Sequence, residues 1–233
     1  MLRANFAKLS HINLLNKKKM KIDIYGFDGF IFDMDGVIVD NYRYHIEAWG
    51  EFFRRKGIDF DATNFTKLYF GKNNTDILQS LYGKTLAEAE IEELGEEKET
   101  IYRELYQPHI KPLEGLIGLM EQLKSYSKKI AIASSAPQSN IEFVVENTGI
   151  AKYIDAIVNG NMVKLGKPNP DIFLKAAQLI KLPPAKCLVF EDSFSGIQAA
   201  KNAGMQVIAV ATTHTKDEHD QTLTIVENFN EIL

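Results

Sequence analysis

Apolar and polar residues follow two patterns along most of this chain. Short, almost continuous apolar runs predict buried strands at residues 22–33, 129–134, 154–158, 187–192 and 207–211, with a weaker run at 223–226. Stretches between them predict helices at about residues 113–127, 138–148, 170–181 and 194–203. Strands that alternate with helices and are apolar on both sides are typical of a buried parallel sheet. The pattern therefore predicts an α/β fold, a Rossmann-like parallel sheet with helices on both faces.

Residues 41–112 do not follow this alternation. They are mostly helical in pattern, rich in charged and aromatic residues, and contain no strand-like run. Because the segment is inserted after the first predicted strand, it predicts a helical cap domain on an α/β core domain of residues 21–40 and 113–233. We interpret the aromatic residues between Trp49 and Phe53 as the apolar core of this cap. A cap that closes over a site excludes water and completes the binding surface.

Composition and charge narrow the classes of protein and partner. The chain has 233 residues, a net charge of −4 and one cysteine, which excludes a disulfide framework and a cysteine-rich metal site. Residues 1–21 hold six basic residues and no acid, so the rest carries a net charge of −10. We expect residues 1–20 to be a disordered basic extension. The acidic remainder argues against nucleic acid as a partner, and no apolar stretch reaches the roughly 20 residues of a membrane helix. We expect a cytoplasmic protein with no membrane partner; a monomer fits, but the sequence does not define the oligomeric state.

Two aspartates, Asp33 and Asp35, stand at the end of the first predicted strand, directly before Gly36. Side chains two apart in a strand point to the same side. At about 4 Å and an effective dielectric constant near 20, two carboxylates repel by about 4 kcal/mol. A bound cation or a shared proton makes such a pair tolerable, and both suit an enzyme with a carboxylate nucleophile and a carboxyl acid–base. The alternative is an ordinary Asp-Gly turn after a strand.

Polar residues also follow the other predicted strands. Ser134 and Ser135 end the second strand, Glu191 and Asp192 end the fourth, and Lys167 precedes a helix that starts with proline. Ligands of open parallel sheets bind at the carboxyl ends of the strands. Carboxylate oxygens suit Mg²⁺, and lysine and serine donors suit a phosphate-sized anion. Each residue alone could end a strand, lie in a solvated turn or cap a helix; together they predict one site.

Four segments resemble, in order and spacing, the motifs of the haloacid dehalogenase-like superfamily. They are FDMDGVIVD (32–40), IAIASS (130–135), GKPNPDIF (166–173) and VFEDSFSGIQAAKNAGM (189–205). The inserted helical segment is similar to the type-1 cap of that superfamily. The sequence YHIEAW (44–49) resembles the beta-phosphoglucomutase-like subfamily and the neighbouring sugar-phosphate phosphatases. The resemblance covers about residues 22–213.

The resemblance implies roles for the matching residues. Asp33 would be the nucleophile that takes the phosphoryl group, and Asp35 would be the general acid–base. Ser134 and Lys167 would bind the transferring phosphoryl oxygens. Hydrolytic dehalogenases of the superfamily usually lack an acid at the position of Asp35, so dehalogenation is not expected.

The resemblance also implies Mg²⁺ as the cofactor. The ion would be held by Asp33, by the backbone carbonyl of Asp35, and by Asp192, with Glu191 binding directly or through water. Phosphoryl transfer depends mainly on positioning and on neutralisation of charge, which a metal ion supplies.

Substrate binding is assigned to the cap and to the second motif. In the mutases that the chain resembles, a cap histidine and a cap lysine couple substrate binding to closure, and His45 and Lys98 match them. The alternative for Lys98, which is flanked by glutamates, is a solvated helix face. Ser135 and the cap-loop residues Lys72 and Asn74 complete the predicted substrate-binding set.

The cap loop favours hydrolysis over mutase activity. A mutase must hold a second phosphate, and the subfamily uses a cap-loop arginine and polar or lysine residues after the second motif. Asn74 stands where that arginine would be, and Ala-Pro-Gln follows Ser135. Asparagine cannot replace the charged fork of arginine. The sequence therefore favours a Mg²⁺-dependent phosphatase acting on a small phosphorylated metabolite, a sugar phosphate by resemblance; the alternatives are a beta-phosphoglucomutase and an inactive phosphometabolite-binding module.

Overall fold

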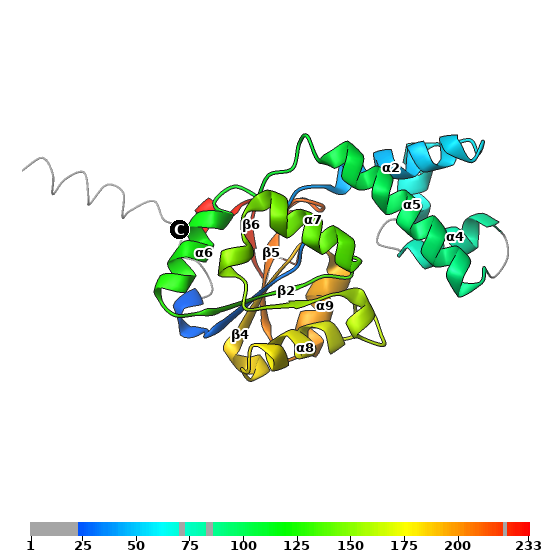
Figure 1. Cartoon of the computed structure of the whole chain (residues 1–233). Coiled ribbons are helices and arrows are strands. Elements are labelled where there is room, and N and C mark those ends of the chain that lie inside the picture. The colour runs from blue at the N-terminus through cyan, green and yellow to red at the C-terminus, as the bar shows by residue number, and fades with distance from the viewer. Residues whose placement is uncertain (1–22, 70–72, 83–85, 221–222) are drawn as a thin grey trace, which may run out of the picture.

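The computed structural model describes residues 23–69, 73–82, 86–220 and 223–233. These residues form a six-stranded sheet in the order β3-β2-β1-β4-β5-β6, and every pairing is parallel (Figure 1). The strands are β1 (Gly29–Phe32), β2 (Lys129–Ala133), β3 (Ala156–Val158), β4 (Cys187–Glu191), β5 (Gln206–Val210) and β6 (Thr224–Val226). The predicted α/β class and parallel sheet are confirmed.

Helices cover both faces of this sheet, and the side chains of β1 show how. Phe30 and Phe32 point into one apolar cluster, whereas Ile31 between them points into the other, as the two-residue period of a strand requires. The first cluster includes α6 (Leu116–Ser125) and α7 (Gln138–Thr148). The second includes α8 (Asp171–Leu179) and α9 (Phe194–Asn202). In the part of the chain that the structure describes, the core also contains five short 3₁₀ turns: η1 (Ile24–Gly26), η2 (Ala151–Tyr153), η3 (Gly160–Met162), η4 (Pro184–Lys186) and η5 (Phe229–Glu231).

The first strand is shorter than its apolar run predicted. Residues 22–33 were expected to be one strand, but the side chain of Asp23 accepts a hydrogen bond from the backbone N–H of Tyr25 and starts the 3₁₀ turn η1. Strand pairing begins only at Gly29. A local side-chain acceptor competes here with the sheet for backbone donors.

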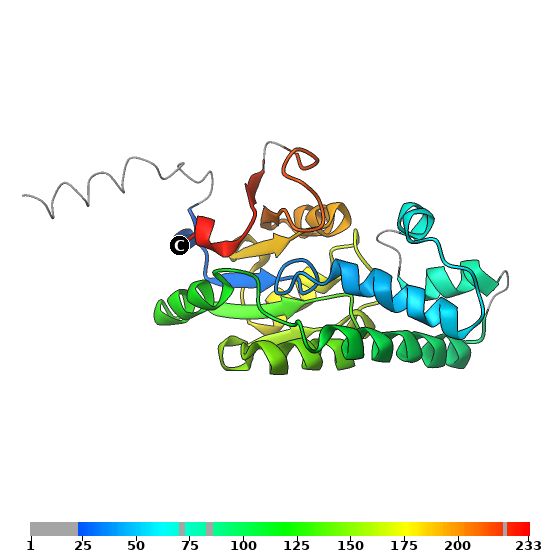
Figure 2. The ribbon, with the colours of Figure 1, turned by 90° about the horizontal axis from the view of Figure 1, so that it is seen from above.

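Between β1 and α6, the described residues form four helices that extend beyond the carboxyl edge of the sheet (Figures 1 and 2). They are α2 (Tyr42–Arg55), α3 (Ala62–Tyr69), α4 (Asn74–Tyr82) and α5 (Glu88–Tyr106). Trp49, Phe52 and Phe53 are buried among them, as predicted, and the rings of Trp49 and Phe65 lie 5.7 Å apart. We call α2 to α5 the cap helices; the exact division of the chain into core and cap stays a prediction, and the predicted extension 1–20 falls outside the described residues.

The strands point towards the cap helices. In Figure 2 the arrows of β1 and β2 end at the side of the sheet from which α2 and α5 extend. The loops that follow the strands therefore lie between the sheet and the cap helices, where open parallel sheets bind ligands. Among the described residues, no helix combines the length and the apolar character that a membrane crossing needs.

Candidate active site

The loop after β1 holds the two aspartates in a fixed backbone. The backbone N–H of Gly36 donates to the carbonyl of Val39 at 2.8 Å, and Gly36 has a φ of +78°. A Cβ atom at this position would overlap the carboxylate of Asp192. Glycine is therefore required here both for the left-handed backbone and for the close approach of an acid.

A buried lysine links the first two acids of the site. The Nζ atom of Lys167 donates to Oδ1 of Asp33 at 2.5 Å and to Oε2 of Glu191 at 2.6 Å. Burial opposes the charged form of Lys167, but the two carboxylates raise its pKa. Burial also opposes ionisation of Glu191, whose pKa is nevertheless lowered, chiefly by the charge and the hydrogen bond of Lys167. The ammonium group thus stabilises two carboxylates from neighbouring strands.

The start of α9 holds Glu191 from the other side. Both the backbone N–H and the hydroxyl of Ser193 donate to Oε1 of Glu191, at 3.0 and 2.7 Å. The same hydroxyl accepts from the backbone N–H of Gly196 and so caps the helix. A Cβ atom at Gly196 would overlap the Glu191 carboxylate. Glycine at this point of the helix lets the carboxylate pack against its first turn.

Three carboxylates form a cluster whose chemistry fits a divalent cation. Asp33, Glu191 and Asp192 are buried, and each offers an oxygen within 4.8 Å of the other two. Burial and the charge of Glu191 raise the pKa of Asp33 to about 8. Burial, then the charges of Glu191 and Asp33, raise the pKa of Asp192 well above its ordinary value. Lys167 offsets only part of this negative charge, and hard carboxylate oxygens are the ligands that Mg²⁺ prefers. The residues present therefore fit a magnesium ion.

Asp35 faces different partners from Asp33. Its Oδ1 accepts from Nδ2 of Asn41 at 2.6 Å and lies 3.9 Å from Nε2 of His45. Burial opposes ionisation of Asp35, but the nearby Nε2–H of His45 and the hydrogen bond from Asn41 lower its pKa. The two-residue period of a strand does not apply, because β1 ends at Phe32 and Asp35 already lies in the following turn. Asp33 thus faces the acid cluster and Asp35 faces the cap.

The cap side of the site contains a chain of polar contacts. Nζ of Lys98 lies 2.8 Å from Nδ1 of His45 and 2.9 Å from Oε1 of Glu99. Because a lysine ammonium can only donate, Nδ1 of His45 accepts and its Nε2 carries the hydrogen that faces Asp35. Lys98 is 2% exposed, so the alternative of a solvated helix face is wrong for this residue. Its role in substrate binding stays a prediction.

The two serines of the second motif have different environments. Ser134 is buried at the carboxyl end of β2, next to β1, and its hydroxyl accepts from the backbone N–H of Ala136 at 3.1 Å. Ser135 is exposed. The backbone of Ser135 packs closely on Gly160. A Cβ atom at Gly160 would lie 2.7 Å from the carbonyl oxygen of Ser135. Both serines lie on the rim to which the strands point, with the hydroxyl of Ser134 as the more enclosed of the two.

The structure describes one of the two predicted cap-loop residues, Asn74. Asn74 begins α4, and its Nδ2 donates to Oε1 of Glu99 at 2.8 Å. Its amide is therefore engaged within the cap rather than turned to an open site. Lys72 lies outside the described residues.

Three residues that touch the predicted site were not predicted from the sequence. Asn41 is fully buried and, although it stands where a helix cap would, its side chain turns to Asp35 instead. The hydroxyl of Thr213 donates to the carboxylate of Asp192. Thr213 follows the strand β5, so the same strand-end rule would have found it. Glu99 stands next to Lys98 among other glutamates, and only the packing of α5 identifies it as buried.

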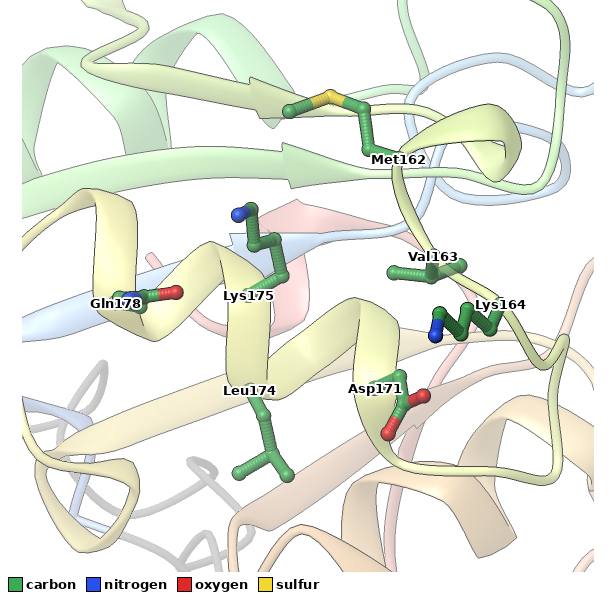
Figure 3. A pocket seen from close by; sticks show the side chains of 7 residues that line it. All are labelled: Met162, Val163, Lys164, Asp171, Leu174, Lys175 and Gln178. Atoms are coloured by element: carbon green, nitrogen blue, oxygen red, sulfur yellow. The ribbon is translucent and has the colours of Figure 1, made fainter.

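One hollow of the surface lies away from these residues. A depression of about 400 Å³ separates α8 from the segment after β3, and seven side chains line it, among them Met162, Leu174 and Lys175 (Figure 3). None of its lining residues belongs to the acid cluster or to its partners.

The fold, the acid cluster and the lysine define the class of protein. A family model described as haloacid dehalogenase-like hydrolase matches residues 27–204. This chain belongs to the haloacid dehalogenase-like hydrolases, a family of enzymes.

Individual relatives show which enzymes of this family the chain is similar to. The fructose-1-phosphate phosphatase YqaB of Escherichia coli is 33% identical over 186 residues, which cover 79% of this chain and 96% of the relative. The beta-phosphoglucomutase of Bacillus subtilis is 36% identical over 188 residues, covering 77% of this chain and 81% of the relative. Among solved structures, a HAD hydrolase of family IA, variant 3, from Entamoeba histolytica matches with a TM-score of 0.81 and 30% identity, covering 88% of this chain and 95% of that chain. The chain is thus similar to enzymes that act on phosphorylated sugars.

Proposed function

We propose that this enzyme is a Mg²⁺-dependent phosphatase that hydrolyses a small phosphorylated sugar through an aspartyl-phosphate. The observation that carries this proposal is the different surroundings of the two aspartates. Asp33 lies in the acid cluster beside Lys167, where a phosphoryl group and a cation can meet. Asp35 lies apart from that cluster, against Asn41 and His45, on the side where a leaving group would enter. A nucleophile and an acid–base need this division of labour.

The reaction proceeds in two displacements. An oxygen of Asp33 attacks phosphorus, the bond from phosphorus to the sugar oxygen breaks, and Asp35 gives that oxygen a proton. Water then attacks the aspartyl-phosphate, the bond from phosphorus to Asp33 breaks, and Asp35 takes the proton that water loses. Asp35 must carry a proton in the first displacement and be ionised in the second; the contacts of Asn41 and His45 favour the ionised form and so favour transfer of the proton to the leaving oxygen.

Neutralisation of charge makes the attack feasible. Mg²⁺ bound by Asp33, Asp192 and Glu191, with the backbone carbonyl of Asp35, would supply positive charge against the phosphoryl oxygens. Lys167 holds Asp33 within hydrogen-bonding distance and adds a second positive charge. Ser134 offers a hydroxyl on the same rim for a phosphoryl oxygen. Each of these groups acts mainly through position, as phosphoryl transfer requires.

The cap helices favour water as the acceptor. A mutase must retain a second phosphate while the first is transferred. Asn74 carries no charge and donates to Glu99. Lys98 pairs with Glu99, and Arg103 donates to Glu96 and Asn140. These described cap groups are committed to protein partners, which supports hydrolysis. We assign Ser135 and Lys72 to the leaving sugar; Asn74 could contact it only through its amide oxygen, because its amide nitrogen donates to Glu99.

A beta-phosphoglucomutase remains the second candidate, for one specific reason. The mutase of Bacillus subtilis is 36% identical to this chain, and the His45–Lys98 pair matches the pair expected of that subfamily. A single assay separates the two reactions, because only hydrolysis releases inorganic phosphate.

The test is a panel of sugar phosphates incubated with the protein and Mg²⁺. It includes fructose 1-phosphate, and beta-glucose 1-phosphate with a trace of the 1,6-bisphosphate. Release of phosphate that is lost in Asp33→Asn supports the phosphatase. Formation of glucose 6-phosphate without release of phosphate would replace it by the mutase. Binding of panel members without turnover would instead indicate a binding module.

A further inference from the structure

One buried contact joins the cap helices to the core close to the second motif. Glu99 on α5 is 4% exposed, and Asn140 on α7 is 1% exposed. Nδ2 of Asn140 donates to Oε2 of Glu99 at 2.8 Å. Asn140 is the third residue of α7 and lies six residues after Ser134. A polar contact this well buried between two parts of a chain forms only when they are closely docked.

Both oxygens of Glu99 are in use. Oε2 accepts from Asn140, and Oε1 accepts from Nζ of Lys98 at 2.9 Å and from Nδ2 of Asn74 at 2.8 Å. Burial opposes ionisation of Glu99, but the charge of Lys98 and the two amide hydrogen bonds lower its pKa to about 2. One ionised carboxylate therefore organises a lysine and an amide of the cap and docks both onto the core.

The donor and acceptor roles of Asn140 are fixed by its two partners. Nη1 of Arg103 donates to Oδ1 of Asn140 at 2.8 Å, while Nδ2 of Asn140 donates to Glu99. A guanidinium group can only donate and an ionised carboxylate can only accept. The side-chain amide of Asn140 therefore has a single satisfactory orientation, which makes the contact directional.

The same carboxylate is connected to the predicted acid–base. Lys98 donates to Glu99, and its Nζ atom also lies 2.8 Å from Nδ1 of His45. On the other side of the ring, Nε2 of His45 lies 3.9 Å from Oδ1 of Asp35. His45 on α2 and Lys98 on α5 both belong to the cap helices, so a displacement of α5 from α7 would move them together relative to Asp35 of the core. Docking of the cap and placement of the groups around Asp35 are thus mechanically linked.

We propose that Glu99 is a positioning residue: by accepting from Asn140 of the core, it docks the cap and places Lys98 and His45 at Asp35. This inference deepens the proposed function and rests on it. It assigns to Glu99 and Asn140 an effect on substrate capture, not contact with the reacting atoms. Closure of a cap of this kind commits the substrate and completes the site.

The test exchanges donor and acceptor across the contact. Glu99→Gln places an amide nitrogen against the amide nitrogen of Asn140, and Arg103 prevents Asn140 from turning over to accept it. Asn140→Asp places two carboxylates against each other. In the double variant, the new glutamine amide donates to the new carboxylate at position 140, while its carbonyl still accepts from Lys98 and Asn74. The double exchange therefore restores every hydrogen bond of the contact.

We expect each single variant to raise KM by about ten- to one-hundredfold, as loss of a hydrogen bond to a buried charge implies. The value of kcat should change less, because Asp33, Lys167 and the acid cluster are untouched. The double variant should return KM to within about threefold of the original value. Hydrogen exchange of residues 96–106 and 138–148 should rise in both single variants and fall back in the double variant, which reports docking without turnover. Glu97→Gln is the matched control. Glu97 lies on α5 like Glu99, but it pairs with Lys56 at the surface.

Two results would overturn the inference. One is a loss of thermal stability in the single variants with KM and kcat unchanged, which is the behaviour of a merely structural contact. The other is a double variant that is no better than the single ones in KM and in hydrogen exchange. Absence of turnover by the original protein on every sugar phosphate would count against the proposed function instead, and the exchange data would still decide the docking role of Glu99.

Discussion

The Nζ atom of Lys167 lies 2.5 Å from Oδ1 of Asp33, although 134 residues separate them in the chain. Each of the two side chains is 8% exposed, and the same ammonium also reaches Glu191. One positive charge therefore faces three buried carboxylates, counting Asp192. The remaining negative charge is what a divalent cation would balance, whereas the lysine orients the predicted nucleophile.

Lys167→Met separates these two roles. Loss of the ammonium should lower kcat by about a hundredfold or more, since one preorganised charged donor is removed from the reacting group. Binding of Mg²⁺, measured by calorimetry, should be retained, because all three carboxylates remain. Lys164→Met is the control: Lys164 is exposed on the same loop, and its loss should leave kcat unchanged. Loss of Mg²⁺ binding in Lys167→Met would show that the lysine mainly holds the metal ligands.

The raised pKa of Asp33 predicts how Mg²⁺ binding depends on pH. Burial and the charge of Glu191 raise this pKa to about 8, so the metal must displace a proton at lower pH. The dissociation constant for Mg²⁺ should therefore fall by about tenfold for each pH unit between pH 6 and pH 8, and then level off. Calorimetry in buffers of different ionisation enthalpy measures both the constant and the protons released. In Asp33→Asn the dependence should become weaker, leaving the part due to Asp192, whose pKa is also raised; a constant that does not vary with pH in the original protein would contradict the prediction.

How far the sequence predicts this site depends on the kind of residue. Asp33, Glu191 and Asp192 could be found because parallel strands bring their carboxyl ends to one edge. That rule needs only the order of strands and the residue after each. The different orientations of Asp33 and Asp35 could not be predicted, because they arise from the turn at Gly36 and not from the period of the strand.

In the cap, the sequence does not predict which polar residues are buried. Lys98 and Glu99 are adjacent in a run of acidic residues, a pattern typical of a solvated helix face, yet both are buried. Their burial comes from the docking of α5 against α2 and α7, and no local pattern encodes it. Asn41 was overlooked for a related reason: a polar residue before a helix is typical of a cap, whereas here its side chain reaches back to Asp35.

Gly36→Ala tests whether close packing of the first loop positions the metal ligands. Gly36 has a φ of +78°, and an added Cβ would overlap the carboxylate of Asp192. We expect the Mg²⁺ concentration that gives half-maximal activity to rise by about tenfold or more, because the added Cβ would displace Asp192, a predicted ligand of the ion. Gly57→Ala is a matched control, since Gly57 has a φ of +67° but nothing within 4 Å of the added atom. It should lose about 1–2 kcal/mol of stability from backbone strain and keep its Mg²⁺ dependence. Equal effects of the two substitutions on Mg²⁺ would leave strain alone as the explanation.

Glu99 should also control how stability responds to acid. Its pKa is lowered from 4.5 to about 2 in the folded protein, so the unfolded chain binds the proton more readily. The stabilisation is therefore fully present above about pH 4.5 and is lost as the pH falls towards 2. A shift of this size corresponds to about 3 kcal/mol for a residue this well buried. The measurement is urea unfolding of the original protein and of Glu99→Gln between pH 3 and pH 7. The difference in unfolding free energy should shrink steadily below about pH 4.5, because glutamine does not titrate. A difference for Glu99→Gln that stays constant down to pH 3 would mean that the charge of Glu99 does not stabilise the docked cap.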